Sequence, residues 1–480
     1  MELAAHLFAI KNGPIGAEIA AFFDFDGTLI SGHSAQVLFG RRLRRREVGM
    51  GEAIRALRVK FGDVLSEPQF ADFAATAAAA WEGEPAAFLD ELADVLYREG
   101  IAAALRHQAW RVVKAHLRAG HTVAIATSAT RVQVARAAAE LGIHHVLCTE
   151  LEVVDERLTG RLAGPTPWGE DKLAAVAGFA AEHGFRLDQA YAYSNGIEDF
   201  PLLAAVGHPH AVNPDAQLAK TARRLNWPVL ELSSPPGAFD LLPALRTTGV
   251  WGAMAAAGYA GLLMNALSRD RWRGVNLTTT TFAQLGTAVG GIDVDVRGQE
   301  HLWAARPAVV LINHQNDLLD LLVSATLMRE RTTAVAKLEA KDVPVVGQLF
   351  TWAQVAFIDR QDGVNARETM RQAVNRLHEG ICVVIAPEGT RSYGPTVGPF
   401  KKGAFHLAVE AGVPIVPVVI RNSGELMPRG SRVLRPGTVE VIVQPPISTR
   451  GWGKADIDAA AESVRRLYQE TLEDWPQRGD

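Results

Sequence analysis

Short apolar runs of strand length alternate with longer helical stretches along most of the chain. After residue 291 the strand candidates are Ile292 to Val296, Val309 to Ile312, Thr333 to Ala336, Gln354 to Ile358, Ile381 to Ile385, Ile415 to Ile420 and Val439 to Val443. Helix candidates between and after them include Val364 to His378, Ala404 to Ala411 and Asp456 to Glu473. This alternation favours a mainly parallel sheet covered by helices, so we predict an α/β fold.

A polar stretch follows one of these buried runs directly. After Ile312 the chain reads Asn313-His314-Gln315-Asn316-Asp317-Leu318-Leu319-Asp320. A histidine between a strand and a helix is a candidate general base, because its ordinary pKa is near neutral and a carboxylate on its far ring nitrogen fixes the tautomer. A capped helix with a surface histidine is the alternative for this stretch taken alone.

Three further blocks follow in order. They are Phe357-Ile358-Asp359-Arg360, then Pro387-Glu388-Gly389-Thr390-Arg391, then Val413-Pro414-Ile415-Val416-Pro417. With the His/Asp stretch they resemble the glycerolipid acyltransferases, in particular the lysophosphatidic acid acyltransferase family. The resemblance implies acyl transfer from acyl-CoA or acyl carrier protein to lysophosphatidic acid, giving phosphatidic acid.

The same resemblance implies roles for individual residues of this region. His314 would take the proton of the acceptor hydroxyl, and Asp320 would orient the ring. Arg360 would bind the acceptor phosphate, and Glu388, Gly389, Thr390 and Arg391 would line the acceptor side. The family has four residues between its histidine and aspartate, whereas Asp320 follows His314 after five. We therefore expect one extra residue in the turn, with Asp317 as the alternative partner.

The first half contains a second candidate site, beginning at Ala20-Ala21-Phe22-Phe23-Asp24-Phe25-Asp26-Gly27-Thr28. Side chains two residues apart point to the same side of an extended strand, so both carboxylates can face one site at its carboxyl end. Such a pair suits an aspartyl nucleophile beside an acid/base, with Mg²⁺ to offset the charge of a phosphate.

This stretch resembles the first motif of the haloacid dehalogenase superfamily, in its phosphoserine-phosphatase-like branch. Thr127 at the end of an apolar run, Lys172 at the start of a helix, and Ser194-Asn195-Gly196-Ile197-Glu198-Asp199 follow in that family's order. The resemblance implies a doubly wound, Rossmann-like domain with a helical cap at about residues 31–109. It also implies that Thr127 and Lys172 bind phosphate, and that the Mg²⁺ ligands are Asp24, Asp26, Asn195 and Asp199.

Asn195 departs from the family, which has aspartate at this position. An amide offers a neutral oxygen where Mg²⁺ favours an anionic one. Two hypotheses follow for the first domain. Either it is a Mg²⁺-dependent phosphatase with weakened metal binding, or it is a regulatory or binding module beside an active acyltransferase.

The stretch between the two regions bears on where the protein works. Ser233-Ser234-Pro235-Pro236-Gly237 has the composition of a linker, and Thr247 to Ser268 contains no charged residue. A helix of about 20 apolar residues crosses a bilayer, but the many glycines and alanines favour interfacial or shallowly inserted helices, here and in Gly274 to Gly291. A membrane-spanning helix and a buried hairpin are the alternatives. We expect domains at 1–235 and 292–480, joined by residues 236–291.

Composition limits the partners and the compartment. The chain has 480 residues and a net charge of −4, which gives no general case for nucleic-acid binding. Two cysteines in separate apolar runs, Cys148 and Cys382, indicate a reducing compartment, and Met1 to Ala20 lacks a signal-peptide pattern. We therefore expect membrane association at the cytoplasmic face of the cell membrane. The sequence does not indicate an oligomeric state.

Overall fold

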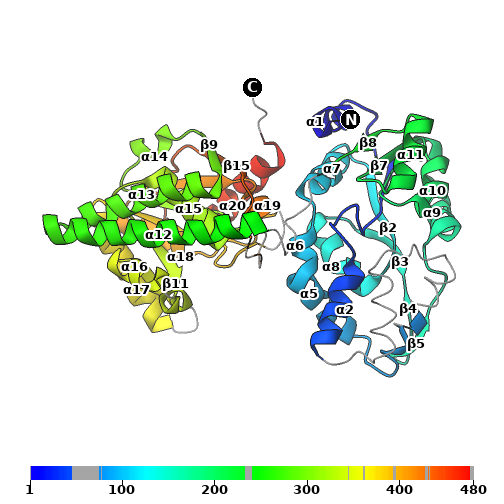
Figure 1. Ribbon diagram of the computed structural model, residues 1–480, viewed down its shortest axis with the longest axis horizontal. Helices are drawn as coiled ribbons and strands as arrows, with labels where there is room; N and C mark the ends of the chain where they lie inside the picture. The colour runs from blue at the N-terminus through cyan, green and yellow to red at the C-terminus, as the bar shows by residue number, and fades with distance from the viewer. Residues whose placement is uncertain are drawn as a thin grey trace. The chain divides into compact units, whose positions relative to one another are not determined.

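The structure is a computed structural model, and it divides the chain into two compact units, Met1–Pro235 and Pro236–Asp480. The residues it describes are 2–45, 75–76, 78–232, 241–343, 345–359, 363–392, 396–427, 431 and 433–475. Each unit has its own sheet and its own core (Figure 1).

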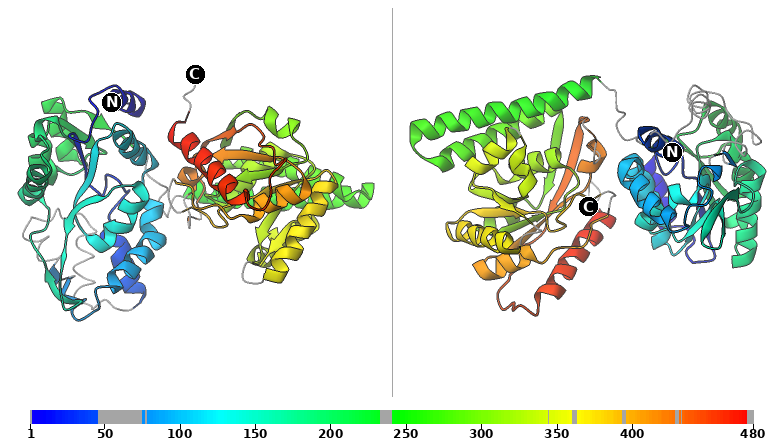
Figure 2. Two further views of the ribbon diagram at one scale, coloured as in Figure 1. Left: turned by 180° about the vertical axis from the view of Figure 1, so that it is seen from behind. Right: turned by 90° about the horizontal axis from the view of Figure 1, so that it is seen from below.

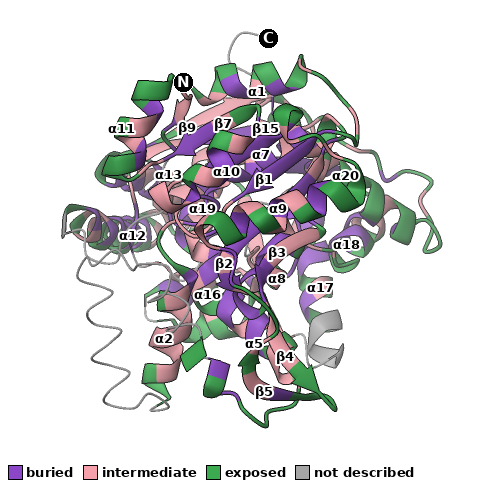
Figure 3. Cartoon of the chain, turned by 90° about the vertical axis from the view of Figure 1, so that its right-hand side faces the viewer, coloured by how far each residue is buried: buried purple, intermediate pink, exposed green. Residues whose placement is uncertain are grey.

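The first unit contains a parallel six-stranded sheet in the order β3-β2-β1-β6-β7-β8. Its strands are β1 (Ala20–Phe23), β2 (Thr122–Thr130), β3 (His145–Thr149), β6 (Tyr191–Ser194), β7 (His208–Val212) and β8 (Val229–Leu230). β1 and β6 are buried throughout, as strands covered by helices on both faces must be (Figure 3). The doubly wound α/β prediction for this half is confirmed.

Helices cover both faces of this sheet. Ala20 and Phe22 of β1 face a core cluster formed with α9 (Gly169–His183), α10 (Phe200–Ala205) and α11 (Ala216–Leu225). The next side chain, Phe23, points the other way, where it stacks on Tyr193 and meets His116 of α7 (His107–Arg118). This alternation fixes the sheet between two layers.

The remaining elements of the first unit surround this core. They are α1 (Leu3–Lys11), α2 (Ser34–Arg44), α5 (Phe88–Leu96), a π-helical turn at Tyr97–Ile101, α6 (Ala102–Ala104), α8 (Arg131–Leu141), and the antiparallel pair β4 (Leu151–Val154) and β5 (Arg157–Leu162). The predicted cap at residues 31–109 includes α2 and α5, whereas its residues 46–74 and 77 lie outside the described residues.

The second unit contains a seven-stranded sheet in the order β12-β11-β13-β10-β14-β15-β9. The strands are β9 (Ile292–Arg297), β10 (Val309–Ile312), β11 (Thr332–Lys337), β12 (Ala356–Ile358), β13 (Cys382–Ile385), β14 (Ile415–Ile420) and β15 (Gly437–Val443). Only the β14 and β15 pair is antiparallel among the pairings described. Because β10 lies between β13 and β14, the residues that follow these three strands meet at one edge of the sheet.

Helices complete the second unit on both sides of the sheet. They are α14 (Glu300–Ala304), α15 (Asp317–Met328), a 3₁₀ turn at Leu338–Asp342, α16 (Val346–Trp352), α17 (Gly363–His378), α18 (Gly403–Ala411), α19 (Ser423–Leu426) and α20 (Ile457–Glu473). The two faces bury separate apolar clusters, one with α15 and one with α17, α18 and α20.

Two long helices open this unit, α12 (Leu241–Ser268) and α13 (Arg271–Gly290), and they lie side by side (Figure 2). Their backbones approach closely, since a Cβ built on Gly261 would lie 1.9 Å from Thr278 Oγ1 and 2.5 Å from the Gly274 oxygen. One side of α12, including Val250, Met254 and Ala257, belongs to the core cluster of the second unit. By length and composition Leu242–Ser268 is apolar enough to cross a membrane, with 33% of its most apolar window buried.

The close approach of α12 and α13 predicts opposite effects for two glycine substitutions in one helix. Gly261→Ala forces a methyl group into Thr278 and should destabilise the fold by about 1–3 kcal/mol. Gly252→Ala is the matched control, because its Cβ would meet nothing within 4 Å. Removing a mid-helix glycine there should stabilise by about 0.5–1 kcal/mol. Thermal unfolding of both variants checks this, and equal melting temperatures would contradict the packing.

Candidate active sites

The loop after β10 carries the first candidate site, and its neighbours hold it firmly. Asn313 donates from Nδ2 to the Ile420 oxygen at 2.7 Å, and its Oδ1 accepts from the Ile420 N–H at 2.7 Å, so the end of β10 is tied to the end of β14. Asn316 caps α15, accepting from the N–H groups of Leu318 and Leu319 at 2.9 and 3.0 Å. α15 begins at Asp317, directly after this loop, and Asp320 lies in its first turn.

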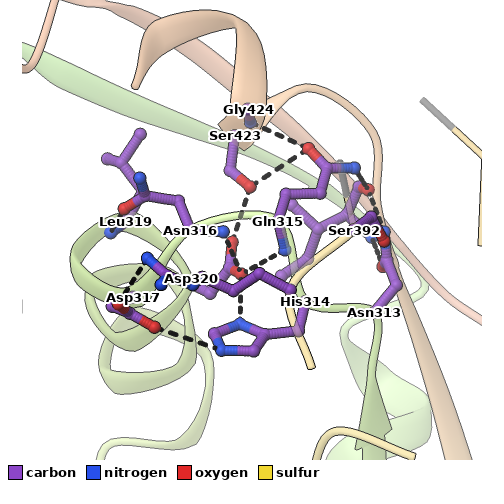
Figure 4. A network of polar contacts seen from close by, with 12 residues as sticks. Asn313, His314, Gln315, Asn316, Asp317, Leu319, Asp320, Ser392, Ser423 and Gly424 are labelled. Atoms are coloured by element: carbon purple, nitrogen blue, oxygen red, sulfur yellow. Dashed lines mark hydrogen bonds and ion pairs between the residues drawn. The ribbon is translucent and has the colours of Figure 1, made fainter. Parts of the chain in front are cut away.

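His314 and Asp320 form a close pair at this loop (Figure 4). Asp320 Oδ2 lies 2.9 Å from His314 Nδ1 and also accepts the N–H groups of Gln315 and Asn316, each at 2.8 Å. Its other oxygen accepts from Ser423 Oγ at 2.5 Å. The ring therefore carries a proton on Nδ1, and Nε2 is the nitrogen that faces away from Asp320.

Asp317 contacts the opposite side of the ring. Its Oδ1 lies 3.3 Å from His314 Nε2, and its Oδ2 lies 2.8 Å from Arg391 Nη1. Burial lowers the pKa of His314, but the hydrogen bonds to Asp317 and Asp320 outweigh it and raise that pKa to about 9. The two aspartates thus differ in position and exposure. Asp320 is buried and contacts Nδ1, whereas Asp317 is exposed and contacts Nε2.

Glu388 lies in the turn after β13 and points into the protein. Its Oε1 accepts the His314 N–H at 2.9 Å, and its Oε2 accepts from Ser392 Oγ at 2.6 Å and the Gly398 N–H at 2.9 Å. Burial raises the pKa of this carboxyl, and these donors oppose the rise. Glu388 therefore holds the His314 loop, whereas we expected it to line the acceptor side.

The other residues predicted for acceptor binding differ in their surroundings. Gly389 is buried in the turn with a φ of 72°, which favours glycine. Thr390 is exposed, and Arg391 is half-buried beside Asp317. Arg360 lies outside the described residues.

In the first unit Lys172 joins two of the other predicted residues near the carboxyl ends of β1 and β6. Lys172 Nζ lies 3.0 Å from Asp24 Oδ1 and 2.7 Å from Asp199 Oδ2. Burial raises the pKa of the Asp24 carboxyl to about 7, and the Lys172 ammonium opposes that rise.

Asp26 turns toward α2, where Ser34 donates to it from N–H at 2.7 Å and from Oγ at 3.1 Å. Thr127 is buried near the end of β2 and accepts from the Ala129 N–H.

The surroundings of Asn195 test whether these residues suit Mg²⁺. One amide atom of Asn195 lies 3.3 Å from Asp24 Oδ2, 2.9 Å from the Asp26 backbone oxygen and 3.1 Å from Thr28 Oγ1. Adjacent ligands of an octahedral Mg²⁺ with bonds near 2.1 Å are about 3 Å apart, so an amide oxygen at this position fits the ion. With the nitrogen there, the amide donates to all three neighbours instead. Among the described residues, no three His, Cys, Asp or Glu side chains are grouped to hold a metal.

Each half of the chain is similar to a known protein family. A model of the haloacid dehalogenase-like hydrolase family matches residues 21–204, and a model of the acyltransferase family matches residues 293–421. The 1-acyl-sn-glycerol-3-phosphate acyltransferase alpha of Mus musculus is 37% identical over 196 residues, 40% of this chain and 68% of that protein. A Mycobacterium tuberculosis protein whose name describes it as a hydrolase is 34% identical over 269 residues, 55% of this chain and 84% of that protein.

Among solved structures, the 1-acyl-sn-glycerophosphate acyltransferase of Thermotoga maritima is 26% identical, with 49% of this chain and 98% of that chain covered and a TM-score of 0.43. The two sheets and the two family matches define a fusion of a hydrolase-type α/β domain with an acyltransferase-type α/β domain. The chain belongs to the 1-acyl-sn-glycerol-3-phosphate acyltransferase family, and it carries a haloacid dehalogenase-like hydrolase domain in its first half.

Ser423 belongs to the His314 site but lies outside the motifs of the sequence. Ser423 is fully buried and contacts both Asp320 and Gln315, yet nothing in its own neighbourhood resembles a motif. Its position after β14 was the available signal, because the ends of neighbouring parallel strands meet at one edge of a sheet. The ion pair of Asp317 with Arg391 had no comparable signal.

Proposed function

We propose that the second domain transfers an acyl group from a thioester to the hydroxyl of lysophosphatidic acid, giving phosphatidic acid. The observation that supports this most directly is the His314–Asp320 pair. Arg391 lies close to this pair, because Asp317 contacts both His314 and Arg391. The family membership supports lysophosphatidic acid as the acceptor. The acyl donor in this proposal is acyl-CoA or acyl carrier protein.

In this proposal His314 Nε2 takes the proton of the acceptor hydroxyl as that oxygen attacks the thioester carbonyl. The new C–O bond forms, the C–S bond breaks, and the leaving sulfur receives the proton back from His314. Asp320 holds the ring and stabilises its charged form. Arg391 binds the acceptor phosphate through its planar fork, together with Arg360 as the family resemblance implies.

We propose that α12 holds this domain on the cytoplasmic face of the membrane. Tyr259, Leu262, Leu263 and Leu267 are exposed and recur at helical spacing on the side of α12 opposite its buried residues. The exposed Arg269, Arg271 and Arg273 follow at one end, and they suit anionic headgroups.

For the first domain we propose Mg²⁺-dependent hydrolysis of a phosphate monoester. Asp24 would be the nucleophile and Asp26 the acid/base, while Thr127 and Lys172 bind the phosphate. Asp24, Asp26, Asn195 and Asp199 would hold Mg²⁺, which neutralises the phosphate charge. The distances of 3.3 and 2.9 Å from one amide atom of Asn195 to Asp24 Oδ2 and to the Asp26 backbone oxygen support this reading. The alternative is a regulatory or binding module. It is favoured if the nitrogen of the Asn195 amide occupies this position, because the amide then donates a hydrogen bond to Asp24.

Replacing His314 tests the acyltransferase proposal. His314→Ala should lower acyl transfer by about 10² to 10⁴, because the general base is lost. Asp320→Ala should cause a similar loss, measured as phosphatidic acid formed from a labelled acyl donor. Near-normal activity of His314→Ala would refute the assignment. A greater loss in Asp317→Ala than in Asp320→Ala would exchange the roles of the two aspartates.

The membrane proposal predicts that charge on the exposed face of α12 releases the protein from lipid. Leu263→Asp with Leu267→Asp should reduce binding to anionic vesicles by about 100-fold or more, since burying each leucine contributes about 1.5–3 kcal/mol. Leu225→Asp is the control, because Leu225 is also exposed but lies on α11 of the first unit. Vesicle flotation measures the effect, and a wild type that stays with the soluble fraction would rule the proposal out.

The metal proposal predicts tighter Mg²⁺ binding when Asn195 becomes a carboxylate. Asn195→Asp should lower the Mg²⁺ concentration needed for half-maximal phosphate release and strengthen Mg²⁺ binding in calorimetry, because a negative charge is restored beside the ion. Asp24→Asn should remove phosphate release in either background. Absence of release from wild type and Asn195→Asp, across phosphatidic acid, lysophosphatidic acid and phosphoserine, would leave the regulatory alternative.

A further inference from the structure

The His314 ring lies between two carboxylates of unequal exposure. Asp320 contacts Nδ1, and its side chain is only 2% exposed and held by three further donors. Asp317 contacts Nε2, and its side chain is 64% exposed. The other charged groups nearby are Arg391, which binds Asp317, and Glu388, which accepts the backbone N–H of His314.

This arrangement opposes the chemistry expected of His314. A ring that donates to a carboxylate from each nitrogen is positively charged and has no lone pair to accept a proton. The carboxylate of Asp317 also occupies the side of Nε2 from which an acceptor hydroxyl would approach. A charged ring with Asp317 in place is therefore a resting form that cannot act as a base.

The group that anchors Asp317 is the one that the acceptor needs. Arg391 Nη1 binds Asp317 Oδ2 at 2.8 Å, and its side chain is 33% exposed. A phosphate monoester carries more charge than a carboxylate and binds a guanidinium through two parallel hydrogen bonds. Once phosphate occupies Arg391, its charge repels Asp317, which lies in the first turn of α15 and faces solvent. Asp320 cannot move into solvent in the same way, because its side chain is buried.

We propose that Asp317 is a positioning residue that keeps His314 inactive until the acceptor phosphate displaces it from Arg391. This inference rests on the proposed acyl transfer and assigns the site a way to require a phosphorylated acceptor. Without that requirement, His314 would activate water, which would attack the thioester to give a free carboxylic acid and a thiol. Asp317 suppresses this hydrolysis when only the donor is bound.

The test is thiol release from acyl-CoA in the absence of acceptor. Asp317→Asn removes the charge with little change of shape, and it should raise thiol release at pH 7 by about tenfold or more. The midpoint of the pH dependence should fall by about 1–2 pH units, because one carboxylate near His314 is lost. Inorganic phosphate should accelerate release by the wild type and not by Asp317→Asn. The KM for lysophosphatidic acid should fall in the variant, since Arg391 is no longer shared.

Asp458→Asn is the matched control. Asp458 also lies in the first turn of a helix, is 68% exposed and pairs with a cation, Lys402, at 2.7 Å, so it should leave thiol release unchanged. Asp317→Asn with the rate and pH dependence of the wild type, or phosphate acting alike on both proteins, would overturn the proposal. Full transfer activity in His314→Ala would instead refute the proposed acyltransferase function, so the two failures are distinguishable.

Discussion

The second domain depends on one buried carboxylate. Asp320 accepts hydrogen bonds from His314, from the backbone of the loop after β10, and from Ser423 after β14. An unpaired buried charge is costly, so these donors must converge if the domain is to fold as it does. The same convergence fixes the tautomer and direction of His314. Folding and the proposed catalysis therefore impose the same requirement on this residue.

Much of this arrangement could be predicted from the sequence because it depends on local patterns. Apolar runs at 309–312 and 415–420 have the bounds of β10 and β14, since turn residues bracket both runs. Asp320, preferred to Asp317 from the sequence as the partner of His314, lies 2.9 Å from His314 Nδ1, although five residues separate the two. The helix that begins at Asp317 places Asp320 in its first turn, beside the loop. The role of Asp320 in orienting the ring stays a prediction.

Other features could not be predicted, because they depend on which strands become neighbours. Ser423 is more than 100 positions from Asp320 and meets it only because β14 pairs with β10. Glu388 is a residue type that can bind a substrate, yet both of its carboxylate oxygens accept hydrogen bonds from the protein itself. A motif identifies a residue type at a site, but hydrogen-bond partners decide whether its side chain faces substrate or protein.

The two proposed phosphate sites differ in the surroundings of their cations. Lys172 is buried between two carboxylates, whereas Arg391 is half-buried beside one exposed carboxylate. We propose that the Arg391 site recognises the phosphate of an acylated glycerol. Incubation of the full-length protein with labelled acyl-CoA, offering lysophosphatidic acid and monoacylglycerol in separate reactions, tests it most directly. We expect labelled phosphatidic acid and almost no diacylglycerol, and equal acylation of the two acceptors would contradict recognition of the phosphate.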